Sequence, residues 1–281
     1  MPRHIACLSF DFDTWSGLVA RGLDTPSPVS RGEFGVVGAG RILNLLESRG
    51  IKASWYVPGV VIKTYPEACH RIVREGHEIG HHGWSHVPPA QLEAAREADE
   101  FGRAVETIVE LTGHKPKGYR SPSWDISDRT IDLILDHGMA YDSSMMAHDC
   151  QPYFARRGDV VKADAPMIFG EATNLVEIPI SWSLDDFPHF EFLRSKDGLL
   201  PGLQNASGVL ENWVADFEYM RRTEEWGALV YTFHPYVIGR GHRMTILEKL
   251  IDALTGMGAE FLTLDQLQTE FRGRVTAGPA G

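Results

Sequence analysis

The sequence predicts an α/β protein folded as a single irregular (β/α)7-8 barrel, and three observations lead to that prediction. Short β-rich runs alternate with amphipathic helical stretches from one end of the chain to the other, which is typical of parallel strands covered by helices. About eight such runs are present, and this number favours closure into a barrel over an open sheet. The length of 281 residues is within the range of one α/β barrel. We therefore treat residues 1–281 as one domain.

Strands and helices can be placed in order along the chain. Strands are expected at 5–12, 52–57, 78–80, 118–120, 141–143, 175–180, 228–233 and 261–264. Helices are expected near 38–48, 66–75, 89–112, 127–137, 208–225 and 244–255. Gly50, Gly76 and Gly138 each follow a predicted helix, as glycines at helix C-termini do. The Gly/Pro-rich segments 17–40 and 151–170 are expected to be long connections, and 272–281 a frayed tail.

Composition excludes several classes of partner. The formal net charge of −11 disfavours binding to nucleic acid. The three cysteines have no paired spacing, which indicates a reducing compartment rather than a disulfide framework. The N-terminus has no apolar segment of signal length, and no apolar stretch approaches the ~20 residues that cross a bilayer. We therefore expect a soluble, cytoplasmic protein with no membrane partner.

Two acidic side chains stand at the end of the first predicted strand. Alternation along the strand places Asp11 and Asp13 on one face, with Phe10 and Phe12 on the other. Two neighbouring carboxylates at the end of an apolar strand are costly unless a cation or a shared proton relieves them. A cation site is one interpretation, and a strand-end turn with two solvated acids is the other.

Four histidines lie within ten residues, far more densely than twelve histidines in 281 residues would by chance. Neutral imidazole is the commonest ligand of zinc-like ions, and catalytic sites typically combine three protein ligands with an open position. Two His-x-x-x-His pairs overlap here, His77/His81 and His82/His86, and spacing alone does not choose between them. The alternative is a surface histidine loop or an adventitious metal-binding patch.

Two further segments place an active side chain where a predicted strand ends near a proline. Arg120 begins such a turn and can hold a carboxylate in its ionised state, although a surface arginine beside a structural turn is the commoner explanation. His234 stands where a β run stops at Pro235. A lone histidine there is more often structural, but in the company of other catalytic groups it is a candidate general acid.

All four clusters fall at the C-terminal ends of different predicted strands. That face is where barrel enzymes assemble their active sites. Unrelated surface features have little reason to coincide there. The sequence therefore predicts one active site built from all four segments.

These segments resemble, in order, the motifs of the polysaccharide deacetylase family. The motifs are SFDFD at 9–13, GHEIGHHGWSH at 76–86, YRSPSW at 119–124 and TFHP at 232–235, with further similarity at 50–59 and 239–243. The resemblance spans roughly residues 5–264. It implies a barrel enzyme that hydrolyses carbon–nitrogen bonds other than peptide bonds.

The resemblance also implies a metal site. Asp13, His82 and His86 would be the ligands, which favours the second histidine pair. Two histidines and a carboxylate suit zinc best, and iron, nickel, cobalt and manganese accept similar ligands.

The same resemblance implies a role for each remaining motif residue. Asp11 would be the general base, Arg120 its orienting partner and His234 the general acid. The backbone N–H of Ser123 would help to stabilise the oxyanion. Family analogy further suggests a homo-oligomer.

Two departures from the common family pattern bear on the substrate. Phe12 separates the two aspartates, and Ser123 and Trp124 stand where tyrosine and glycine are usual. Both features resemble a branch that contains cytoplasmic peptidoglycan deacetylase-like proteins, cyclic imide hydrolases and metal-independent-type allantoinases. We therefore expect a small cytosolic amide, cyclic imide or ureide as substrate. The alternatives are an N-acetyl sugar or peptidoglycan deacetylase with the same site and, more distantly, a non-catalytic ligand-binding barrel.

A compact substrate pocket is expected from a further set of side chains. Its aromatic walls would come from Trp124, Trp182, Phe187 and Phe190, although each of these can equally fill the core. Glu33 and Asp186 would bind polar N–H groups of the substrate. Asp185 and Asp186 can instead be turn or helix-capping residues.

Overall fold

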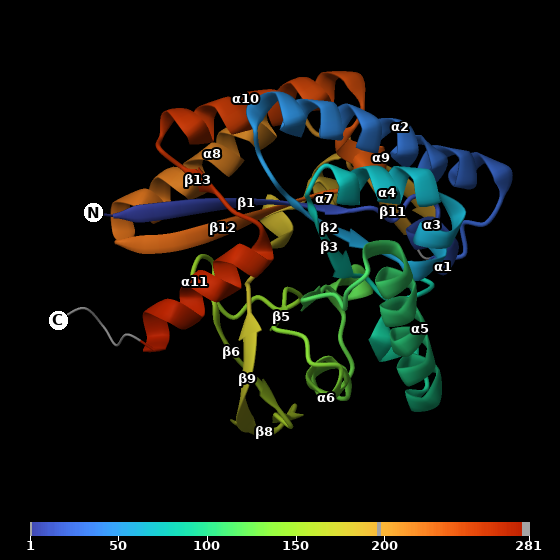
Figure 1. Ribbon diagram of the computed structural model, residues 1–281, viewed down its shortest axis with the longest axis vertical. Helices are drawn as coiled ribbons and strands as arrows, with labels where there is room; N and C mark the ends of the chain where they lie inside the picture. Colours follow the sequence, from blue (N-terminus) through green and yellow to red (C-terminus); the bar gives the residue numbers. More distant parts are fainter. Residues whose placement is uncertain (1, 196–197, 277–281) are drawn as a thin grey trace.

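The computed structural model describes residues 2–195 and 198–276, and within them one curled sheet forms the centre of the molecule (Figure 1). The strand order in this nine-stranded sheet is β12-β1-β2-β3-β4-β5-β9-β6, with β13 also beside β1. All pairs are parallel except β6 with β9. The strands are β1 (Arg3–Asp11), β2 (Ser54–Val57), β3 (Glu78–His81), β4 (Gly118–Tyr119), β5 (Tyr141–Asp142), β6 (Tyr153–Arg157), β9 (Glu171–Glu177), β12 (Trp226–Phe233) and β13 (Glu260–Phe261).

Helices cover the sheet on both sides. In Figure 1, α2, α8 and α10 lie over one face of β1 and β12, and α11 lies against the other face. The helices are α1 (Ser16–Ala20), α2 (Pro26–Arg49), α3 (Gly59–Thr64), α4 (Pro66–Arg74), α5 (Ala94–Thr112), α6 (Thr130–Asp136), α7 (Asp186–Phe190), α8 (Ala206–Thr223), α9 (Pro235–Ile238), α10 (Gly241–Gly256) and α11 (Leu264–Thr276). No helix within the described ranges is long and apolar enough to cross a membrane.

The α/β barrel predicted from the sequence is confirmed as a curled half-barrel. The sheet ends at β12 on one side and at β6 on the other. Across the open side, an isolated bridge between Asp185 and Thr232 brings the segment that follows β9 to the end of β12. The barrel is thus drawn together at the carboxyl ends of its strands.

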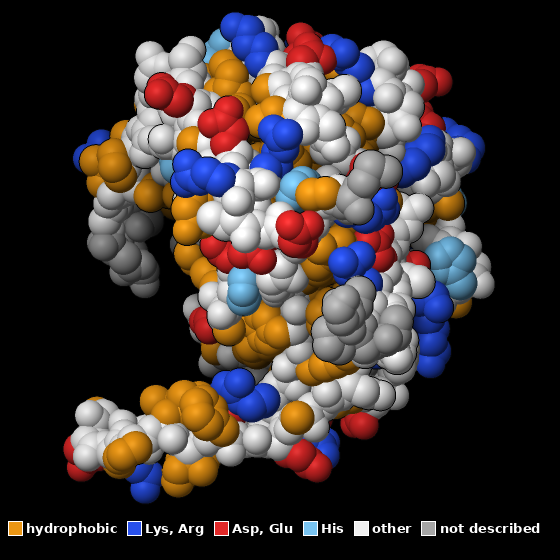
Figure 2. Space-filling view, turned by 90° about the vertical axis from the view of Figure 1, so that its left-hand side faces the viewer, with side chains coloured by type: hydrophobic (Ala, Val, Ile, Leu, Met, Phe, Trp, Pro, Cys, Tyr) orange, Lys and Arg blue, Asp and Glu red, His pale blue; other side chains and the backbone are white. Residues whose placement is uncertain are grey.

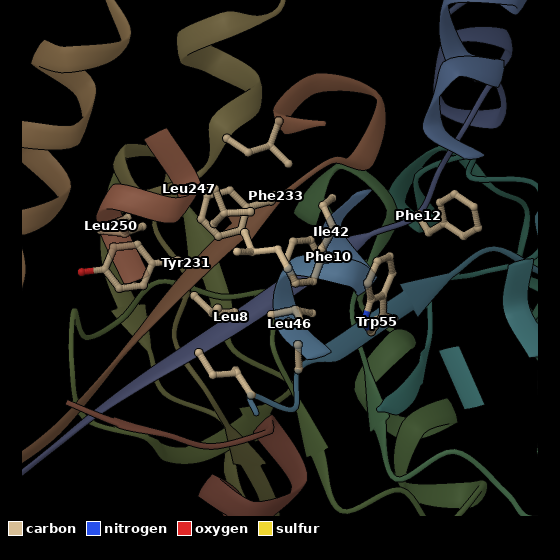
Figure 3. Close-up of a cluster of buried hydrophobic side chains, with 14 of the residues drawn as sticks. Leu8, Phe10, Phe12, Ile42, Leu46, Trp55, Tyr231, Phe233, Leu247 and Leu250 are labelled. Carbon is tan, nitrogen blue, oxygen red and sulfur yellow. The ribbon is translucent and has the colours of Figure 1, made fainter. Parts of the chain in front are cut away.

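One side of β1 builds the core under the helices. Leu8, Phe10 and Phe12 point to this side and are buried (Figure 3). They pack with side chains of α2 and α10, such as Ile42 and Leu247. Burial of each such side chain contributes about 1.5–3 kcal/mol. This core fixes the direction of β1 and therefore of the residues at its end.

The other side of β1 faces the inside of the half-barrel and changes character along its length. Ile5 and Cys7 belong to a second buried cluster, which α11 closes from below. Ser9, Asp11 and Asp13 follow on the same side because strand side chains alternate. The interior is therefore apolar at the amino end of the strand and polar at its carboxyl end.

Most predicted elements are present, and three expectations about the connections need correction. Segment 17–40 contains α1 and the first fifteen residues of α2, so the predicted helix at 38–48 begins at Pro26 instead. Segment 151–170 contains β6 and the hairpin of β7 (Val160–Lys162) and β8 (Ala165–Ile168). The expected frayed tail is helical in α11 as far as Thr276, and residues 277–281 lie outside the described part.

The β7–β8 hairpin and the residues beside it project from the body of the molecule. Figure 2 shows hydrophobic side chains gathered on this projection. Val161, Ile168 and Phe169 are 72%, 64% and 69% exposed. None of the three lines the cavity described below. The projection therefore adds apolar surface away from the candidate site.

Candidate active site

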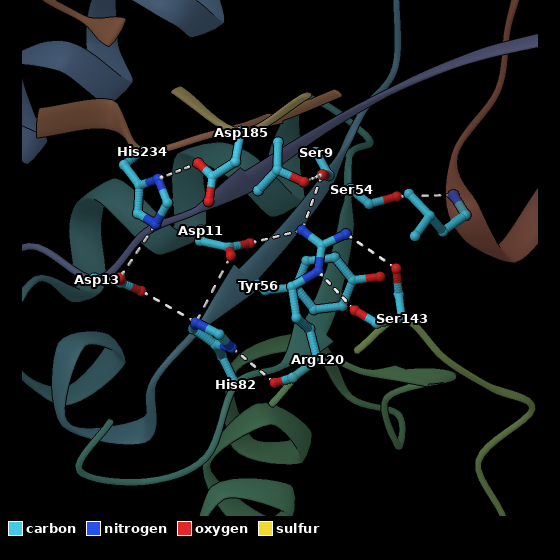
Figure 4. A network of polar contacts seen from close by, with 12 residues as sticks. Ser9, Asp11, Asp13, Ser54, Tyr56, His82, Arg120, Ser143, Asp185 and His234 are labelled. Atoms are coloured by element: carbon cyan, nitrogen blue, oxygen red, sulfur yellow. Dashed lines mark hydrogen bonds and ion pairs between the residues drawn. The ribbon is translucent and has the colours of Figure 1, made fainter. Parts of the chain in front are cut away.

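The four predicted segments meet at the carboxyl ends of their strands. Asp11 ends β1, His82 follows β3, Arg120 follows β4 and His234 follows β12. Figure 4 shows their side chains pointing toward one another, together with Asp13. All are buried, His234 being the most exposed at 8%. Parallel strands explain this convergence, since their carboxyl ends share one edge of the sheet.

Asp13, His82 and His86 surround a common point. The Nε2 atom of His82 is 3.3 Å from Asp13 Oδ1, and the Nε2 atom of His86 is 3.0 Å from Asp13 Oδ2. One ligand-type atom from each side chain lies within 4.8 Å of the others. The other predicted histidine pair is elsewhere: His81 packs on Phe101 outside the barrel, and the Nδ1 atom of His77 accepts a hydrogen bond from the backbone of residue 53.

The tautomer of His82 is fixed by its surroundings. Its Nδ1 atom lies 2.7 Å from the carbonyl oxygen of Arg120, which can only accept, so Nδ1 carries the proton. In the neutral ring, the lone pair of Nε2 then faces carboxylate oxygens of Asp13 at 3.3 Å and Asp11 at 3.9 Å. A lone pair facing two carboxylates requires a cation or a second proton between them. An imidazole nitrogen that faces carboxylates in this way is available to bind a cation.

The pKa values at this point reflect burial and close opposite charges. Burial alone raises the pKa of Asp13, but His86 and His82 outweigh it and lower that pKa well below its usual value. Burial lowers the pKa of His82, yet Asp11 and Asp13 outweigh it and raise this pKa. For His86, burial prevails over Asp13 and the pKa is lowered. Asp13 is therefore ionised at neutral pH, as a ligand must be.

The Asp11 carboxylate is held by a fully buried guanidinium. Arg120 Nη1 donates to Asp11 Oδ1 at 2.8 Å and to the Ser9 hydroxyl at 2.9 Å. Its Nε and Nη2 atoms donate to the carbonyl and hydroxyl oxygens of Ser143. The guanidinium also lies over the ring of Tyr56 at 4.2 Å. These contacts fix Arg120, which in turn fixes the direction of the Asp11 carboxylate.

His234 is oriented by two aspartates in the segment before α7. Its Nδ1 atom is 2.8 Å from Asp186 Oδ1 and 3.4 Å from Asp185 Oδ1. Burial lowers the pKa of His234, but Asp185 and Asp186 outweigh it and raise this pKa well above the usual value. Its Nε2 atom is left facing Asp13 Oδ2 at 3.7 Å. The protonated ring thus points one N–H into the site.

The expectation that Asp186 binds the substrate needs correction. Its side chain is fully buried, and both carboxylate oxygens accept from the backbone N–H of His234 at 3.0 Å. Asp185, whose Oδ1 atom accepts from the backbone N–H of Phe187, is the N-cap of α7. Asp186 therefore positions His234, and the capping alternative describes Asp185 correctly.

Strained backbone is concentrated around the site. The described non-glycine residues with positive φ are five, and four of them are here: Thr14 (50°), His86 (64°), Ser123 (55°) and Trp124 (55°). Such conformations cost of order 1–3 kcal/mol each and persist where packing over-determines them. The strain at Ser123 and Trp124 turns both residues toward the cavity, where they belong to its lining.

A narrow cavity opens above these groups. The rings of Trp124 and Trp182 are stacked at 4.1 Å in its wall, and Phe187 is also in the wall. Glu33 lies exposed on α2 and is not part of this lining, and Phe190 is buried in the helix-side core. Arg21 lines the cavity although the sequence reasoning missed it; its Nη2 atom donates to the Ser123 hydroxyl. A wider cavity of about 890 Å³ adjoins at Arg21 and Ser123.

Comparisons with known proteins agree with this geometry. Residues 36–141 match the family model of polysaccharide deacetylases. A peptidoglycan deacetylase from Helicobacter pylori is 35% identical, over 93% of this chain and 94% of the relative. The chain belongs to the polysaccharide deacetylase family. As a polysaccharide deacetylase family member, it is a hydrolase of the class that acts on amide carbon–nitrogen bonds.

Several solved structures share the fold of this chain. A polysaccharide deacetylase from Mycobacterium smegmatis superimposes with a TM-score of 0.83 at 29% identity, covering 97% of this chain and 91% of that one. The Puue allantoinase superimposes with a TM-score of 0.77, covering 100% of this chain and 93% of that one. At 18% identity, the second likeness concerns the fold alone.

Proposed function

We propose that this protein is a metal-dependent hydrolase of an amide, cyclic imide or ureide bond in a small cytosolic molecule. The observation that carries the metal is the orientation of His82, whose proton on Nδ1 leaves the Nε2 lone pair aimed at Asp13 and Asp11. Asp13 Oδ1 and His86 Nδ1 are buried without a hydrogen-bond partner in the described part of the chain. A divalent cation held by Asp13, His82 and His86 would give Asp13 Oδ1 a partner.

The donor set suits zinc, and iron, nickel, cobalt and manganese fit similar ligands. A divalent ion in such a site polarises the scissile carbonyl and, for zinc, lowers the pKa of a bound water to about 7.

The remaining residues would supply proton transfer. Asp11, oriented by Arg120, would take a proton from the attacking water. His234, kept protonated by Asp185 and Asp186 and oriented by Asp186, would give a proton to the leaving nitrogen. Each such group contributes typically 10²–10⁴-fold to the rate. Ser123 lines the cavity, and its backbone N–H would stabilise the developing oxyanion.

The narrowness of the cavity supports a compact substrate. The stacked pair Trp124/Trp182 and the ring of Phe187 leave a slot beside the ligand triad, and aromatic walls favour a flat group. Arg21 adds a positive charge at the mouth of this slot. A planar imide or ureide ring matches such walls.

A second candidate is an N-acetyl sugar or peptidoglycan deacetylase with the same machinery. Two observations favour it: the adjoining cavity of about 890 Å³ can hold sugar units beside the slot, and the chain is similar to a peptidoglycan deacetylase over nearly its whole length.

A substrate panel separates the two candidates. Purified protein is assayed for ring opening of succinimide, hydantoin and allantoin, and in parallel for acetate release from N-acetylglucosamine oligomers. We expect hydrolysis of at least one ring compound and little release of acetate. Acetate release without ring opening would replace the first candidate by the second. No hydrolysis of any amide by metal-loaded protein would contradict both.

A further inference from the structure

A third cavity lies outside the candidate active site and is lined by positive side chains. Its volume is about 350 Å³. Arg31 comes from α2, Glu191 follows α7, and Arg240 and Arg243 lie at the start of α10. None of these residues lines the cavity that contains Asp13. The segment 239–243 belongs to the sequence resemblance described above, yet the proposed reaction gives it no task.

Arg243 is the most unusual side chain of this cavity because it is a buried arginine. Its side chain is only 8% exposed, and buried arginines are rare unless a carboxylate or another anion accompanies them. Its Nη1 and Nη2 atoms donate to the carbonyl oxygens of Val237 and Phe190, both at 3.0 Å. Its Nε atom is buried with no hydrogen-bond partner in the described ranges. The two carbonyl oxygens accept hydrogen bonds from the guanidinium but do not neutralise its positive charge.

The partners of the neighbouring arginines do not supply a counter-charge for Arg243 either. Arg31 pairs with Glu191 at 2.8 Å, and Glu191 is 4% exposed. Arg240 lies over the ring of Phe34 at 3.7 Å. Among residues 2–195 and 198–276, neither Arg240 nor Arg243 has a carboxylate within ion-pair distance. Three guanidiniums therefore lie around the one carboxylate of Glu191, and only Arg31 is paired with it at ion-pair distance, in a protein whose net charge is −11.

We propose that this cavity is a binding site for a small organic oxyanion, a carboxylate or a phosphate ester. Arg240 and Arg243 would bind the oxyanion, and Arg31 would be shared between it and Glu191. The apolar walls from Phe190 and Tyr236 would contact the carbon part of the ligand. Guanidinium groups bind both planar carboxylates and tetrahedral phosphates through paired N–H donors, so the two sources share one chemistry.

The test is titration calorimetry of the metal-loaded protein at low and matched ionic strength. The probes are glutarate and glycerol phosphate, titrated separately. The variants are Arg240→Gln and Arg243→Gln, and the control is Arg221→Gln, which removes an exposed arginine of α8 outside the cavity. Thermal unfolding of each variant establishes that it is folded, and Arg240→Gln provides the test if the buried Arg243→Gln does not fold.

We expect the wild-type protein to bind at least one probe. Arg240→Gln should bind it about tenfold more weakly or worse, because one charge-assisted hydrogen bond is lost. Arg221→Gln should bind as the wild type does. Binding of glutarate alone or of glycerol phosphate alone supports the site and identifies its ligand class. Absence of binding to the wild type would overturn the proposal. Equal affinities of Arg240→Gln and the wild type would also overturn it, because the anion would then be bound elsewhere, such as at the metal.

Discussion

At the residue scale, the buried Asp11–Arg120 pair links the proposed catalysis to the stability of the fold. The two charges are 2.8 Å apart and fully enclosed, and the other partners of Arg120 are neutral. Removing the charge of Asp11 therefore leaves a guanidinium buried without an ionic partner. Such a change costs about 3–5 kcal/mol of unfolding free energy.

Asp11→Asn is expected to lower kcat by about 10²–10⁴-fold because the base is lost. It should also lower the free energy of unfolding while the metal content stays unchanged. Steady-state kinetics below the melting temperature of the variant measure kcat. Urea unfolding measures the free energy of unfolding, and metal analysis measures the metal content. Ser9→Ala is the matched control, since it removes a neutral partner of the same guanidinium and should cost about 1 kcal/mol with little effect on kcat. Turnover near that of the wild type in Asp11→Asn would exclude Asp11 as the base.

A second buried pair, Asp142 and Glu177, gives a pH-dependent prediction. Burial raises the pKa of Asp142 to about 6 and that of Glu177 well above its usual value. The two residues are paired across β5 and β9, and each has one buried carboxyl oxygen without a hydrogen-bond partner in the described part of the chain. The other Glu177 oxygen accepts from the backbone N–H groups of Ser144 and Met145. Because the folded pKa values exceed the unfolded ones, the folded state binds the extra proton. The resulting stabilisation is complete below about pH 4 and is lost progressively as the pH rises through 6 and above.

Glu177→Gln should remove much of this pH dependence. The glutamine carbonyl can keep the two backbone hydrogen bonds, and its amide can donate to Asp142 at every pH. The unfolding free energy of the variant minus that of the wild type should therefore increase from about pH 5 to about pH 8. The expected increase is on the order of 2 kcal/mol. Urea unfolding at the two pH values measures this gain. An equal difference between variant and wild type at both values would show that the pair holds no shared proton.

Individual residues differed in how far the sequence could place them. Motif residues at strand ends were predictable because strand alternation fixes the side that Asp11 and Asp13 face. Arg21 and the pairing of Asp186 with His234 were not, since both depend on short segments after turns whose path no periodicity determines. Glu33 was expected at the substrate, yet it lies on the exposed side of α2.

At the element scale, α2 shows why composition misled the prediction of a long connection at 17–40. Its glycines were interpreted as loop residues. In the structure, Gly32, Gly35 and Gly38 line one face of the helix. A Cβ atom on Gly32 would lie 2.5 Å from Trp15 Cα, and a Cβ atom on Gly38 would lie 2.0 Å from the Pro235 carbonyl oxygen. They are small because the helix packs closely on the segments that carry Asp13 and His234.

Gly38→Ala tests this packing. The added methyl group would push against Pro235, directly after His234, and overpacking of this kind costs about 1–3 kcal/mol. Turnover should fall as well, because His234 would be displaced. Gly40→Ala in the same helix is the matched control, since its methyl group would meet only Arg71 Nη1 at 3.8 Å. That variant should be neutral or more stable by about 0.5–1 kcal/mol. Equal unfolding free energies of the two variants would contradict the close-packing account.

The regular elements were more predictable than the irregular ones. The apolar runs of β1 and β12 and the glycine ends of α2, α4 and α6 appear as expected, with Gly50, Gly76 and Gly138 at φ of 65°, 74° and 73°. The β7–β8 hairpin and its neighbours were missed because they are largely exposed, so no alternation of apolar and polar residues marks them.

At the scale of the whole molecule, the account depends on the parallel sheet. Eight parallel strands in the described part of the chain place their carboxyl ends in one direction, so residues more than 200 positions apart reach one centre. This convergence was predictable from the alternation of strands and helices. The degree of closure was not, because it depends on one bridge between Asp185 and Thr232.

The most direct test is the metal content of the purified protein. Wild type, the double variant His82→Ala/His86→Ala and the control His70→Ala/His114→Ala are compared by inductively coupled plasma mass spectrometry. The control removes two exposed histidines outside the site. We predict that the wild type and the control retain a divalent ion in stoichiometric amount, and that the site variant, folded as judged by circular dichroism, loses it. Equal metal content in a folded His82→Ala/His86→Ala protein would contradict the assignment of Asp13, His82 and His86 as the metal site.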